Sequence, residues 1–165
     1  MDFLERTQFL TQLDAQLLAK CRCDAYVGSG PGGQHRNKNY TGLRPTLLDD
    51  PAICASDETE RSQLANRRKA LAKLRRKVAL EYRAALPEDA GYTHLALENP
   101  EYPAEMAKLL DALEESGYEH KKAAERLNLT PTRLLKELYR DTELWQRFQS
   151  RRRALGLSEL KAPRG

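Results

Sequence analysis

Gly28-Ser29-Gly30-Pro31-Gly32-Gly33-Gln34-His35-Arg36-Asn37-Lys38 is the stretch around which this chain is organised. Four of its first six residues are glycine, and no other part of the sequence concentrates glycine in this way. Glycine adopts positive φ angles and lets a backbone approach a partner closely, while Pro31 restricts the backbone within the run. The stretch therefore predicts an exposed, partly rigid loop that presents one amide side chain, Gln34, and is followed by polar and basic residues.

A second stretch, Arg61-Ser62-Gln63-Leu64-Ala65-Asn66, precedes a strongly basic run. Residues 67–77 contain seven cations and no acid, whereas the whole chain carries a net charge of only +4. A solvated helix face is one interpretation of such a run. Without acids among them, however, the cations would repel one another unless an anionic partner were present, which favours contact with RNA.

Together, the two stretches resemble the motifs of class I peptide chain release factors and of the shorter, release-factor-like ribosome rescue proteins. The family pattern is roughly Ser-Gly-x-Gly-Gly-Gln-His-x-Asn-Lys for the first stretch, and Arg-Ser-Gln-x-x-Asn at the start of a basic helix for the second. The resemblance covers roughly residues 20–85, about two fifths of the chain. Because two separate motifs occur in the family's order, the match is specific.

The resemblance implies a substrate, the ester that joins a nascent peptide to the terminal ribose of tRNA. In the family, the backbone amide of the glutamine, here Gln34, donates to the reacting centre, and its side chain shapes a pocket that admits water. Gly32 and Gly33 carry no side chain that would keep the backbone away from that centre. Because the motif offers no obvious general base, we expect the loop to complete the peptidyl transferase centre of the ribosome. The resemblance implies no cofactor or metal, and it adds a glutamine methyltransferase acting on Gln34 as a candidate partner.

The candidate site residues fall into two groups. The catalytic group is Gly32, Gly33 and Gln34. The nucleic-acid-binding group combines the polar and basic residues that follow the glycines with those of the basic helix: Arg36, Asn37, Lys38, Arg44, Arg61, Gln63, Arg67, Arg68, Lys69, Lys73, Arg75 and Arg76. His35 titrates near neutrality in ordinary surroundings, but the resemblance makes it a structural residue at the base of the loop.

Two departures from the family pattern and two alternatives accompany this interpretation. Arg36 replaces a small aliphatic residue, and Thr41-Gly42-Leu43-Arg44 stands before Pro45 where Ser-Ala-Val-Arg is common. An ordinary glycine-rich turn and a phosphate-binding loop are the alternatives for the first stretch. Its spacing fits neither a Walker loop nor a dinucleotide fingerprint.

The first half of the chain predicts a small α/β domain at residues 20–86, preceded by an amphipathic helix at 3–19. Strands are predicted at 21–27, with Cys21, Cys23 and Ala25 on a buried face, at 43–48, where Pro45 requires an edge position, and at 52–55. A single long helix is predicted over 57–84. Its first turns would carry the acids Asp57, Glu58 and Glu60, and its apolar stripe would pack on the sheet through Leu64, Leu71, Leu74, Val78 and Tyr82.

The second half predicts a linker at 87–103 and a helical domain at 104–161, with helices at 104–116, 120–127 and 131–154. The Ala123-Ala124-x-x-Leu127 pattern resembles helix-turn-helix modules of the Fis-like kind, although a generic three-helix bundle explains it equally well. In such a module the exposed side of the recognition helix would carry Arg133, Lys136 and Arg140. Neighbouring acids, including Glu137 and Asp141, offset these cations, so DNA is not expected as a partner.

The predicted fold class is therefore α+β, a small mixed or antiparallel sheet packed with a long basic helix, followed by an all-α domain with helix-turn-helix as one option. The odd cysteine count argues against a disulfide framework, and the spacing around Cys21 and Cys23 does not suit zinc. We find no signal peptide and no run of apolar residues long enough to span a membrane, so we expect a cytoplasmic protein without membrane contact.

The predicted function is codon-independent hydrolysis of peptidyl-tRNA on stalled ribosomes, because only about twenty residues precede the first strand and leave no room for a stop-codon-reading domain. The expected partners are the ribosome and peptidyl-tRNA. One alternative is a non-enzymatic RNA-binding protein of the same fold, and another is a regulator whose C-terminal module binds DNA.

Overall fold

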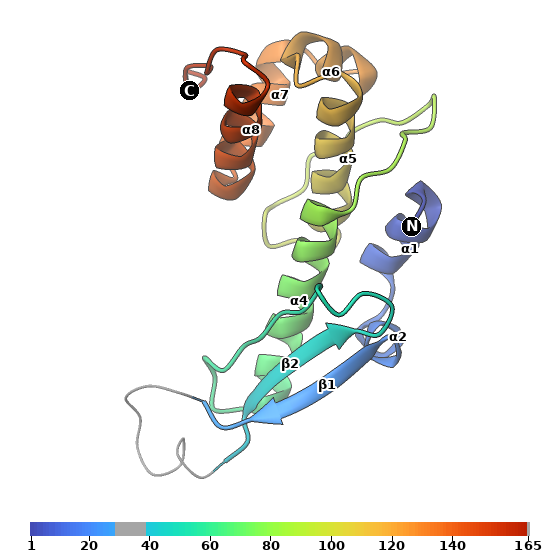
Figure 1. Ribbon diagram of the computed structural model, residues 1–165, viewed down its shortest axis with the longest axis vertical. Coiled ribbons are helices and arrows are strands. Elements are labelled where there is room, and N and C mark those ends of the chain that lie inside the picture. Colours follow the sequence, from blue (N-terminus) through green and yellow to red (C-terminus); the bar gives the residue numbers. More distant parts are fainter. Residues whose placement is uncertain (29–38, 165) are drawn as a thin grey trace. The chain divides into compact units, whose positions relative to one another are not determined.

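The computed structural model describes residues 1–28 and 39–164. Within these ranges the chain divides into two compact units. One unit is Arg6–Glu81, and the other combines Met1–Glu5 with Tyr82–Gly165. Figure 1 labels the helices and strands of both units.

A two-stranded antiparallel sheet forms the centre of the unit at residues 6–81. Strand β1 is Cys21–Tyr26 and strand β2 is Gly42–Leu47, with the register running from Cys21 opposite Leu47 to Tyr26 opposite Gly42. The strands predicted at 21–27 and 43–48 are thereby confirmed. Since β1 leads into the glycine-rich stretch and β2 leads out of it, the sheet is the hairpin that carries this stretch (Figure 1).

The outer edge of β2 pairs with residues 53–57, although not as a regular strand. Leu43 exchanges both backbone hydrogen bonds with Asp57, at 3.0 and 3.1 Å, and Leu47 N–H donates to Ile53 at 3.0 Å. Between them, Ala55 N–H donates to the oxygen of Pro45 at 3.1 Å, but no return bond forms because proline has no N–H. The strand predicted at 52–55 is therefore wrong: this described segment makes only isolated bridges to β2.

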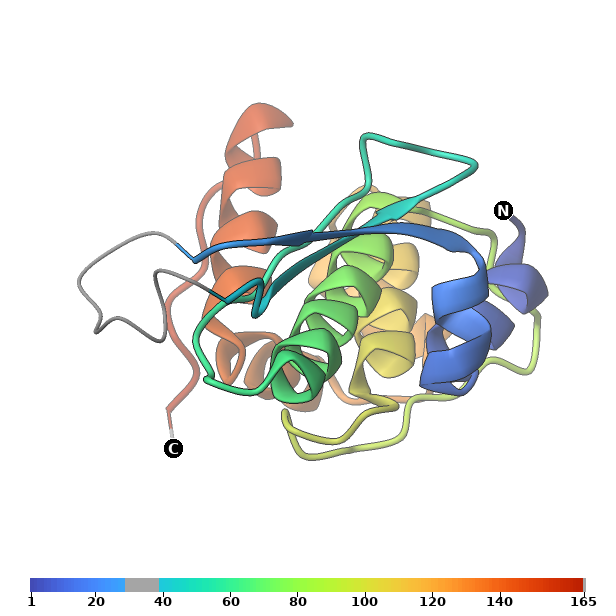
Figure 2. The same ribbon diagram turned by 90° about the horizontal axis from the view of Figure 1, so that it is seen from below.

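The predicted buried face of β1 is also wrong, because Cys23 and Ala25 are exposed. The long helix α4, Gln63–Glu81, packs against β2, while β1 is contacted by the short helix α2, Asp14–Ala19 (Figure 2). The core therefore lies between α4 and β2. Its members include Leu43, Leu47, Leu71, Leu74 and Val78.

The helix predicted at 3–19 is broken into α1, Phe3–Thr11, and α2. Leu13 adopts an extended conformation, with φ −62° and ψ 151°, and its N–H donates to the side-chain oxygen of Gln16 at 3.1 Å. The guanidinium of Arg75 binds at this break, donating to the Gln12 main-chain oxygen at 2.8 Å and to the Asp14 carboxylate at 2.7 Å. The break is thus stabilised from α4.

Helix α4 begins six residues later than the predicted start at 57. Asp57 instead pairs with β2, and Ser62 precedes the first turn, where its main-chain oxygen accepts from Asn66 N–H at 3.0 Å. The three acids predicted for the first turns, Asp57, Glu58 and Glu60, therefore lie before the helix. Leu64, predicted in the apolar stripe, is 47% exposed, whereas the stripe is confirmed from Leu71 to Val78.

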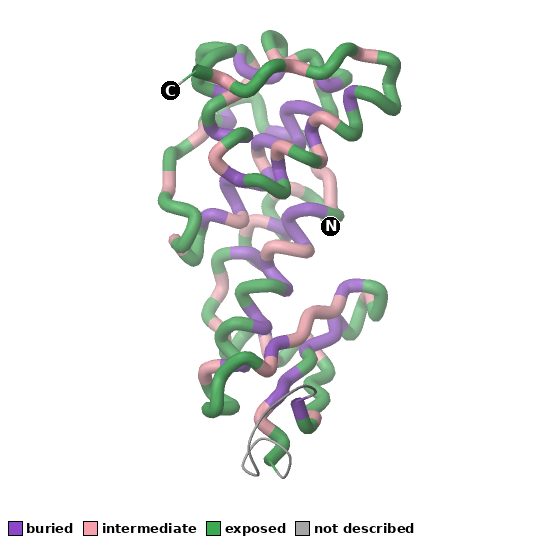
Figure 3. Tube along the Cα trace, turned by 90° about the vertical axis from the view of Figure 1, so that its left-hand side faces the viewer, coloured by how far each residue is buried: buried purple, intermediate pink, exposed green. Residues whose placement is uncertain are grey.

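The unit that contains residues 82–165 is helical. Its helices are α5, Tyr102–Glu115, α6, His120–Arg126, α7, Pro131–Tyr139, and α8, Thr142–Ala154. The helices predicted at 104–116 and 120–127 are confirmed. Buried positions recur along them (Figure 3). The assignment of α6 and α7 as a helix-turn-helix stays a prediction.

The single helix predicted at 131–154 is wrong, because Asp141 separates α7 from α8. The Asp141 carboxylate accepts from Leu144 N–H at 3.3 Å and from the Tyr102 hydroxyl at 2.9 Å. Asp141 is therefore the N-cap of α8, a role for which aspartate is strongly preferred. Thr130 is the N-cap of α7, since its hydroxyl oxygen accepts from Arg133 N–H at 3.2 Å.

Candidate functional site

The catalytic residues predicted from the sequence, Gly32, Gly33 and Gln34, lie outside the described residues, as do Arg36, Asn37 and Lys38. The structure describes the residues on either side of them. The candidate site is therefore built from the two ends of the hairpin and from the start of α4.

The ends of β1 and β2 meet at a tyrosine and a glycine. Tyr26 lies directly opposite Gly42 in the register. A Cβ atom at Gly42 would lie 2.7–3.0 Å from atoms of the Tyr26 ring, which is closer than real Cβ contacts. The absence of a side chain at Gly42 is thus what allows the ring to cover the strand at this point.

The residues just before β2 are bound by two amide side chains from the start of α4. Gln63 Nε2 donates to the main-chain oxygen of Tyr40 at 2.9 Å. Asn66 Nδ2 donates to the main-chain oxygen of Thr41 at 2.8 Å. Gln63 and Asn66 both belong to the Arg-Ser-Gln-x-x-Asn motif, so this motif contacts the chain where it leaves the glycine-rich stretch.

Asn66 also binds the segment that precedes α4. Its Oδ1 accepts from Glu60 N–H at 2.8 Å, and its Nδ2 donates to the Glu60 main-chain oxygen at 2.9 Å. The side chain is fully buried, and an asparagine amide that is withdrawn from water requires such partners. One neutral amide therefore joins residue 41, residue 60 and the first turn of α4.

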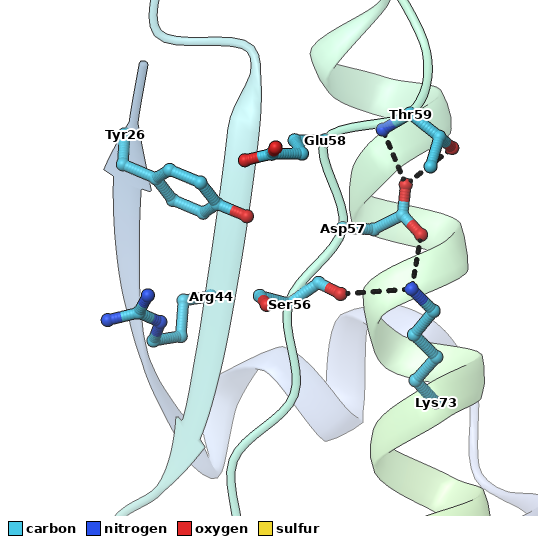
Figure 4. Close-up of a pocket in the computed structure, with 7 residues that line it drawn as sticks. All are labelled: Tyr26, Arg44, Ser56, Asp57, Glu58, Thr59 and Lys73. Carbon is cyan, nitrogen blue, oxygen red and sulfur yellow. Dashed lines mark hydrogen bonds and ion pairs between the residues drawn. The ribbon is translucent and has the colours of Figure 1, made fainter. Parts of the chain in front are cut away.

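A shallow polar pocket of about 420 Å³ lies beside this junction. Figure 4 shows Tyr26 and Arg44 on its sheet side, with Asp57 and Lys73 on the side of α4. The remaining lining residues are Ser56, Glu58 and Thr59. The Arg44 guanidinium lies 5.4 Å from the centroid of the Tyr26 ring, within the range of a cation–π contact.

Asp57 is the buried acid of this pocket. Its carboxylate accepts from Lys73 Nζ at 2.8 Å and from the N–H and hydroxyl of Thr59 at 3.0 and 2.8 Å. Burial on its own would raise the pKa of Asp57, but the hydrogen bonds from Lys73 and Thr59 outweigh it and lower that pKa below its usual value. Asp57 is thus a structural carboxylate that remains charged, and not a proton donor for catalysis near neutral pH.

The cations predicted to bind nucleic acid fall into different surroundings. Arg75 is buried and paired with Asp14, so its guanidinium does not face solvent. The prediction that Arg75 belongs to an RNA-binding surface is therefore wrong. Lys69 and Lys73 are bound to Glu60 and Asp57. Arg67 and Arg68 are exposed in the N-terminal part of α4, and Arg61 is exposed just before this helix. Arg44 is exposed on β2, and Arg76 is partly exposed.

The thiols of β1 are poorly suited to nucleophilic chemistry. Burial, followed by the neighbouring Cys23, raises the pKa of Cys21 to about 11. Burial and Asp24 also raise the pKa of Cys23. Both thiols are therefore protonated near neutral pH. Among the described residues, no cluster of three or more histidines, cysteines or acids has the arrangement of a metal site.

In the helical unit, two of the three cations predicted on the exposed side of the recognition helix, Arg133 and Arg140, are directed at one acid, whereas Lys136 is exposed as predicted. Glu137 is buried, and its carboxylate binds Arg133 Nη2 at 2.7 Å and Arg140 Nε at 2.8 Å. It also accepts from the Tyr92 hydroxyl at 2.8 Å and contacts His94 Nδ1 at 2.8 Å. The prediction that Arg140 is exposed is wrong, because Glu137 and the main-chain oxygen of Leu95 hold its side chain.

Sequence reasoning missed the contacts that Asn66 and Tyr26 make beside the glycine-rich stretch. Asn66 was visible as the last position of the Arg-Ser-Gln-x-x-Asn motif, but nothing local in the sequence indicates that it contacts residue 41. Tyr26 carried no sequence signal of its own, because its role depends on the register that places Gly42 opposite it.

Comparison with known proteins relates part of the chain to one family. The RF-1 domain matches residues 15–96. Peptide chain release factor 1 of Enterococcus faecalis is 47% identical over 57 residues, which is 34% of this chain and 16% of that protein. The corresponding proteins of Granulibacter bethesdensis and Leptospira biflexa are 43% identical over 65 residues and 45% identical over 58 residues.

The chain spans less than a fifth of the length of these relatives, with 18% of the Granulibacter protein and 16% of the Leptospira protein covered, against 39% and 35% of this chain. No solved structure matches the chain. Among the described helices, none combines the length and the apolar character needed to cross a membrane.

Proposed function

Because residues 15–96 form an RF-1 domain and the chain is a class I release factor-like protein, we propose that it releases nascent peptides by hydrolysing the peptidyl-tRNA ester on the ribosome. The reaction would take place in the cytoplasm and would need no stop codon. The Gly32-Gly33-Gln34 segment would enter the peptidyl transferase centre, where the Gln34 backbone amide would stabilise the developing oxyanion. Ribosomal RNA would supply the proton transfers for which the segment has no group.

One observation carries this proposal. The two family motifs lie about thirty residues apart in the sequence, and hydrogen bonds of 2.8 and 2.9 Å join the second motif to the chain that leaves the first. A glycine-rich turn without a function would not require a second motif to bind its base. The arrangement therefore supports a hairpin built to present the Gly-Gly-Gln segment from a helix.

The exposed cations at the start of α4 would contact the RNA that surrounds the reaction. Arg61 lies two residues before Gln63, just ahead of α4, and Arg67 and Arg68 follow Asn66, so all three lie close in sequence to the residues that bind the hairpin. Phosphate contacts position a protein on nucleic acid without reading its sequence. The helical unit would dock on the ribosome, because its arginines are largely paired with its own acids and offer little charge to duplex DNA.

The test is release of a labelled peptide from ribosomes programmed with an mRNA that lacks a stop codon, compared with ribosomes that hold a stop codon in the decoding site. We expect release in both states. Gly33→Ala should reduce the release rate by at least about 100-fold, because a Cβ atom would keep the backbone from the ester. Its affinity for ribosomes should stay close to that of the wild type.

Gly91→Ala is the matched control. It makes the same chemical change at a glycine where an added Cβ would meet no atom within 4 Å, so release should be unchanged. If the wild-type protein binds ribosomes and releases no peptide in either state, the hydrolase proposal fails and a non-catalytic RNA-binding protein of this family takes its place.

A further inference from the structure

We infer that Gln63 and Asn66 are positioning residues for the peptide-release reaction, and that Gln63 is not the RNA contact that its basic surroundings suggest. The inference rests on the proposed function and deepens it. It assigns the Arg-Ser-Gln-x-x-Asn motif the task of fixing the hairpin that carries the Gly-Gly-Gln segment on the helix that carries the RNA-facing cations.

The Gln63 side chain points at the protein's own backbone. Gln63 is exposed as a residue, yet its Nε2 donates to the main-chain oxygen of Tyr40 at 2.9 Å. A glutamine that bound RNA through this nitrogen would have to give up that bond. The side-chain N–H of Gln63 is therefore used in a hydrogen bond to the protein's own backbone.

Asn66 is fully buried, so no solvent molecule or RNA group reaches its side chain. Its two bonds to Glu60 fix the orientation of the amide, and that orientation directs the remaining Nδ2 hydrogen at the Thr41 oxygen. An asparagine is needed for this arrangement because one side chain must accept from one backbone group and donate to two others. Aspartate has nearly the same shape but lacks the donors.

The bonds from Gln63 and Asn66 hold the chain that leads from the glycine-rich stretch into β2. Tyr40 and Thr41 are consecutive, and they join the glycine-rich stretch to β2 at the point where Gly42 pairs with Tyr26. Fixing both carbonyls fixes the direction in which the chain enters the hairpin. Because a displacement of about 1 Å at a reacting group can reduce a rate by about 100-fold, loss of these bonds should act on the chemical step.

The same helix turn thus performs two tasks. Arg67 and Arg68 follow Asn66 directly and are exposed, while Gln63 and Asn66 bind the hairpin from the protein side. Contact of α4 with RNA phosphates would then set the place of the Gly-Gly-Gln segment as well. Substitutions of the two amides should lower the rate of peptide release, whereas substitutions of the two arginines should weaken binding to the ribosome.

The test uses the full-length protein and Gln63→Met, which keeps the length of the side chain, removes the donor and adds no charge. In the release assay we expect kcat to fall by about tenfold, with the ribosome concentration for half-maximal rate unchanged. Asn66→Asp should lower kcat further, by about 100-fold. Gln8→Met, at an exposed glutamine of α1, is the matched control and should leave both parameters unchanged.

A second readout does not depend on activity. Backbone hydrogen exchange at residues 39–43 should become faster in Gln63→Met, with exchange in the middle of α4 unchanged. An increased half-maximal concentration with unchanged kcat would overturn the inference and return Gln63 to the RNA surface. Unchanged kinetics together with unchanged exchange would overturn it as well. If the wild-type protein releases no peptide while exchange still responds, the proposed function fails and the attachment of the hairpin to α4 stands.

Discussion

The helices α4 and α7 both carry clustered cations, and they use them in different ways. On α4, Arg67 and Arg68 are exposed and have no ion-pair partner among the described residues. On α7, Arg133 and Arg140 both bind the buried carboxylate of Glu137. The first cluster leaves positive charge at the surface, whereas the second is neutralised within the unit.

The difference arises from the position of one acid. Glu137 lies four residues after Arg133 and three before Arg140, so all three fall on neighbouring turns of the same helix face. Residues 67–77 contain no acid at all, so any partner for an α4 cation must come from another part of the chain. The number of cations in a helix is therefore a poorer guide to nucleic-acid binding than the absence of acids at helical spacing.

The largest effect in this comparison is expected at the neutralised cluster. Glu137→Gln keeps the size of the side chain but leaves two arginines, Tyr92 and His94 without their shared carboxylate. We expect the free energy of unfolding of the helical unit to fall by about 3 kcal/mol, because removing one partner of a buried ion pair leaves the other charges uncompensated. Denaturant titration followed by fluorescence of Trp145, the single tryptophan, measures this change.

The control for this variant is Glu125→Gln, an exposed glutamate of α6. It removes the same charge from the same unit, and it should change the stability by no more than about 0.5 kcal/mol. Equal stability for Glu137→Gln and Glu125→Gln would show that the contacts of Glu137 contribute little, and the contrast between the two helices would lose its energetic basis.

The second prediction addresses the surface cluster. Arg67→Gln combined with Arg68→Gln should weaken binding to ribosomal RNA and reduce the slope of log Kd against log salt by about 1.5, since each phosphate contact contributes roughly 0.7 to 0.9. Stability should change by no more than about 0.5 kcal/mol. Arg133→Gln is the contrasting variant: it should lower stability and leave the salt slope unchanged. The same slope in all three proteins would assign Arg67 and Arg68 to an ordinary solvated face.

The smallest effect is expected at Lys73, a cation of α4 that resembles Arg133 and Arg140 because it binds a buried carboxylate, that of Asp57. The folded-state pKa of Asp57 is lowered, so its carboxylate contributes stability that is fully present above the unfolded-state pKa near 3.8. That contribution is lost as the pH falls through the lower, folded-state pKa.

Asp57→Asn should therefore lose less stability than the wild type between pH 5 and the acid range below pH 3.8, as measured by circular dichroism during denaturant titration. Lys73→Gln should leave the salt slope of RNA binding unchanged. A reduced slope in Lys73→Gln would place this lysine with Arg67 and Arg68 in spite of its ion pair.

Much of the fold could be predicted because its signals are local. The positions of the two strands and the apolar stripe from Leu71 to Val78 follow from patterns that extend over only a few residues. Two errors occurred at aspartates that were placed inside a predicted helix although each lies outside one. Asp141 was placed inside a helix although it caps one, and Asp57 was placed in a first turn although it pairs with β2.

The candidate site was less predictable, because its residues are connected over long distances in the sequence. Arg75 follows the buried row of Leu71 at a spacing of four, which hints at burial, but its partner Asp14 is 61 residues away. Asn66 and Thr41 are 25 residues apart. A family motif reports that such positions matter, whereas only the three-dimensional structure reports which carbonyl each side chain binds.

The pairing of Arg75 has a practical consequence for anyone who shortens this protein. The RF-1 domain match begins at residue 15, which makes that residue an obvious place to start a truncated chain. Such a chain would lack both acceptors of the Arg75 guanidinium, the Gln12 carbonyl and the Asp14 carboxylate, and would leave a buried cation without these partners. The boundary that sequence similarity gives is therefore not the boundary of the folded unit, which begins at Arg6.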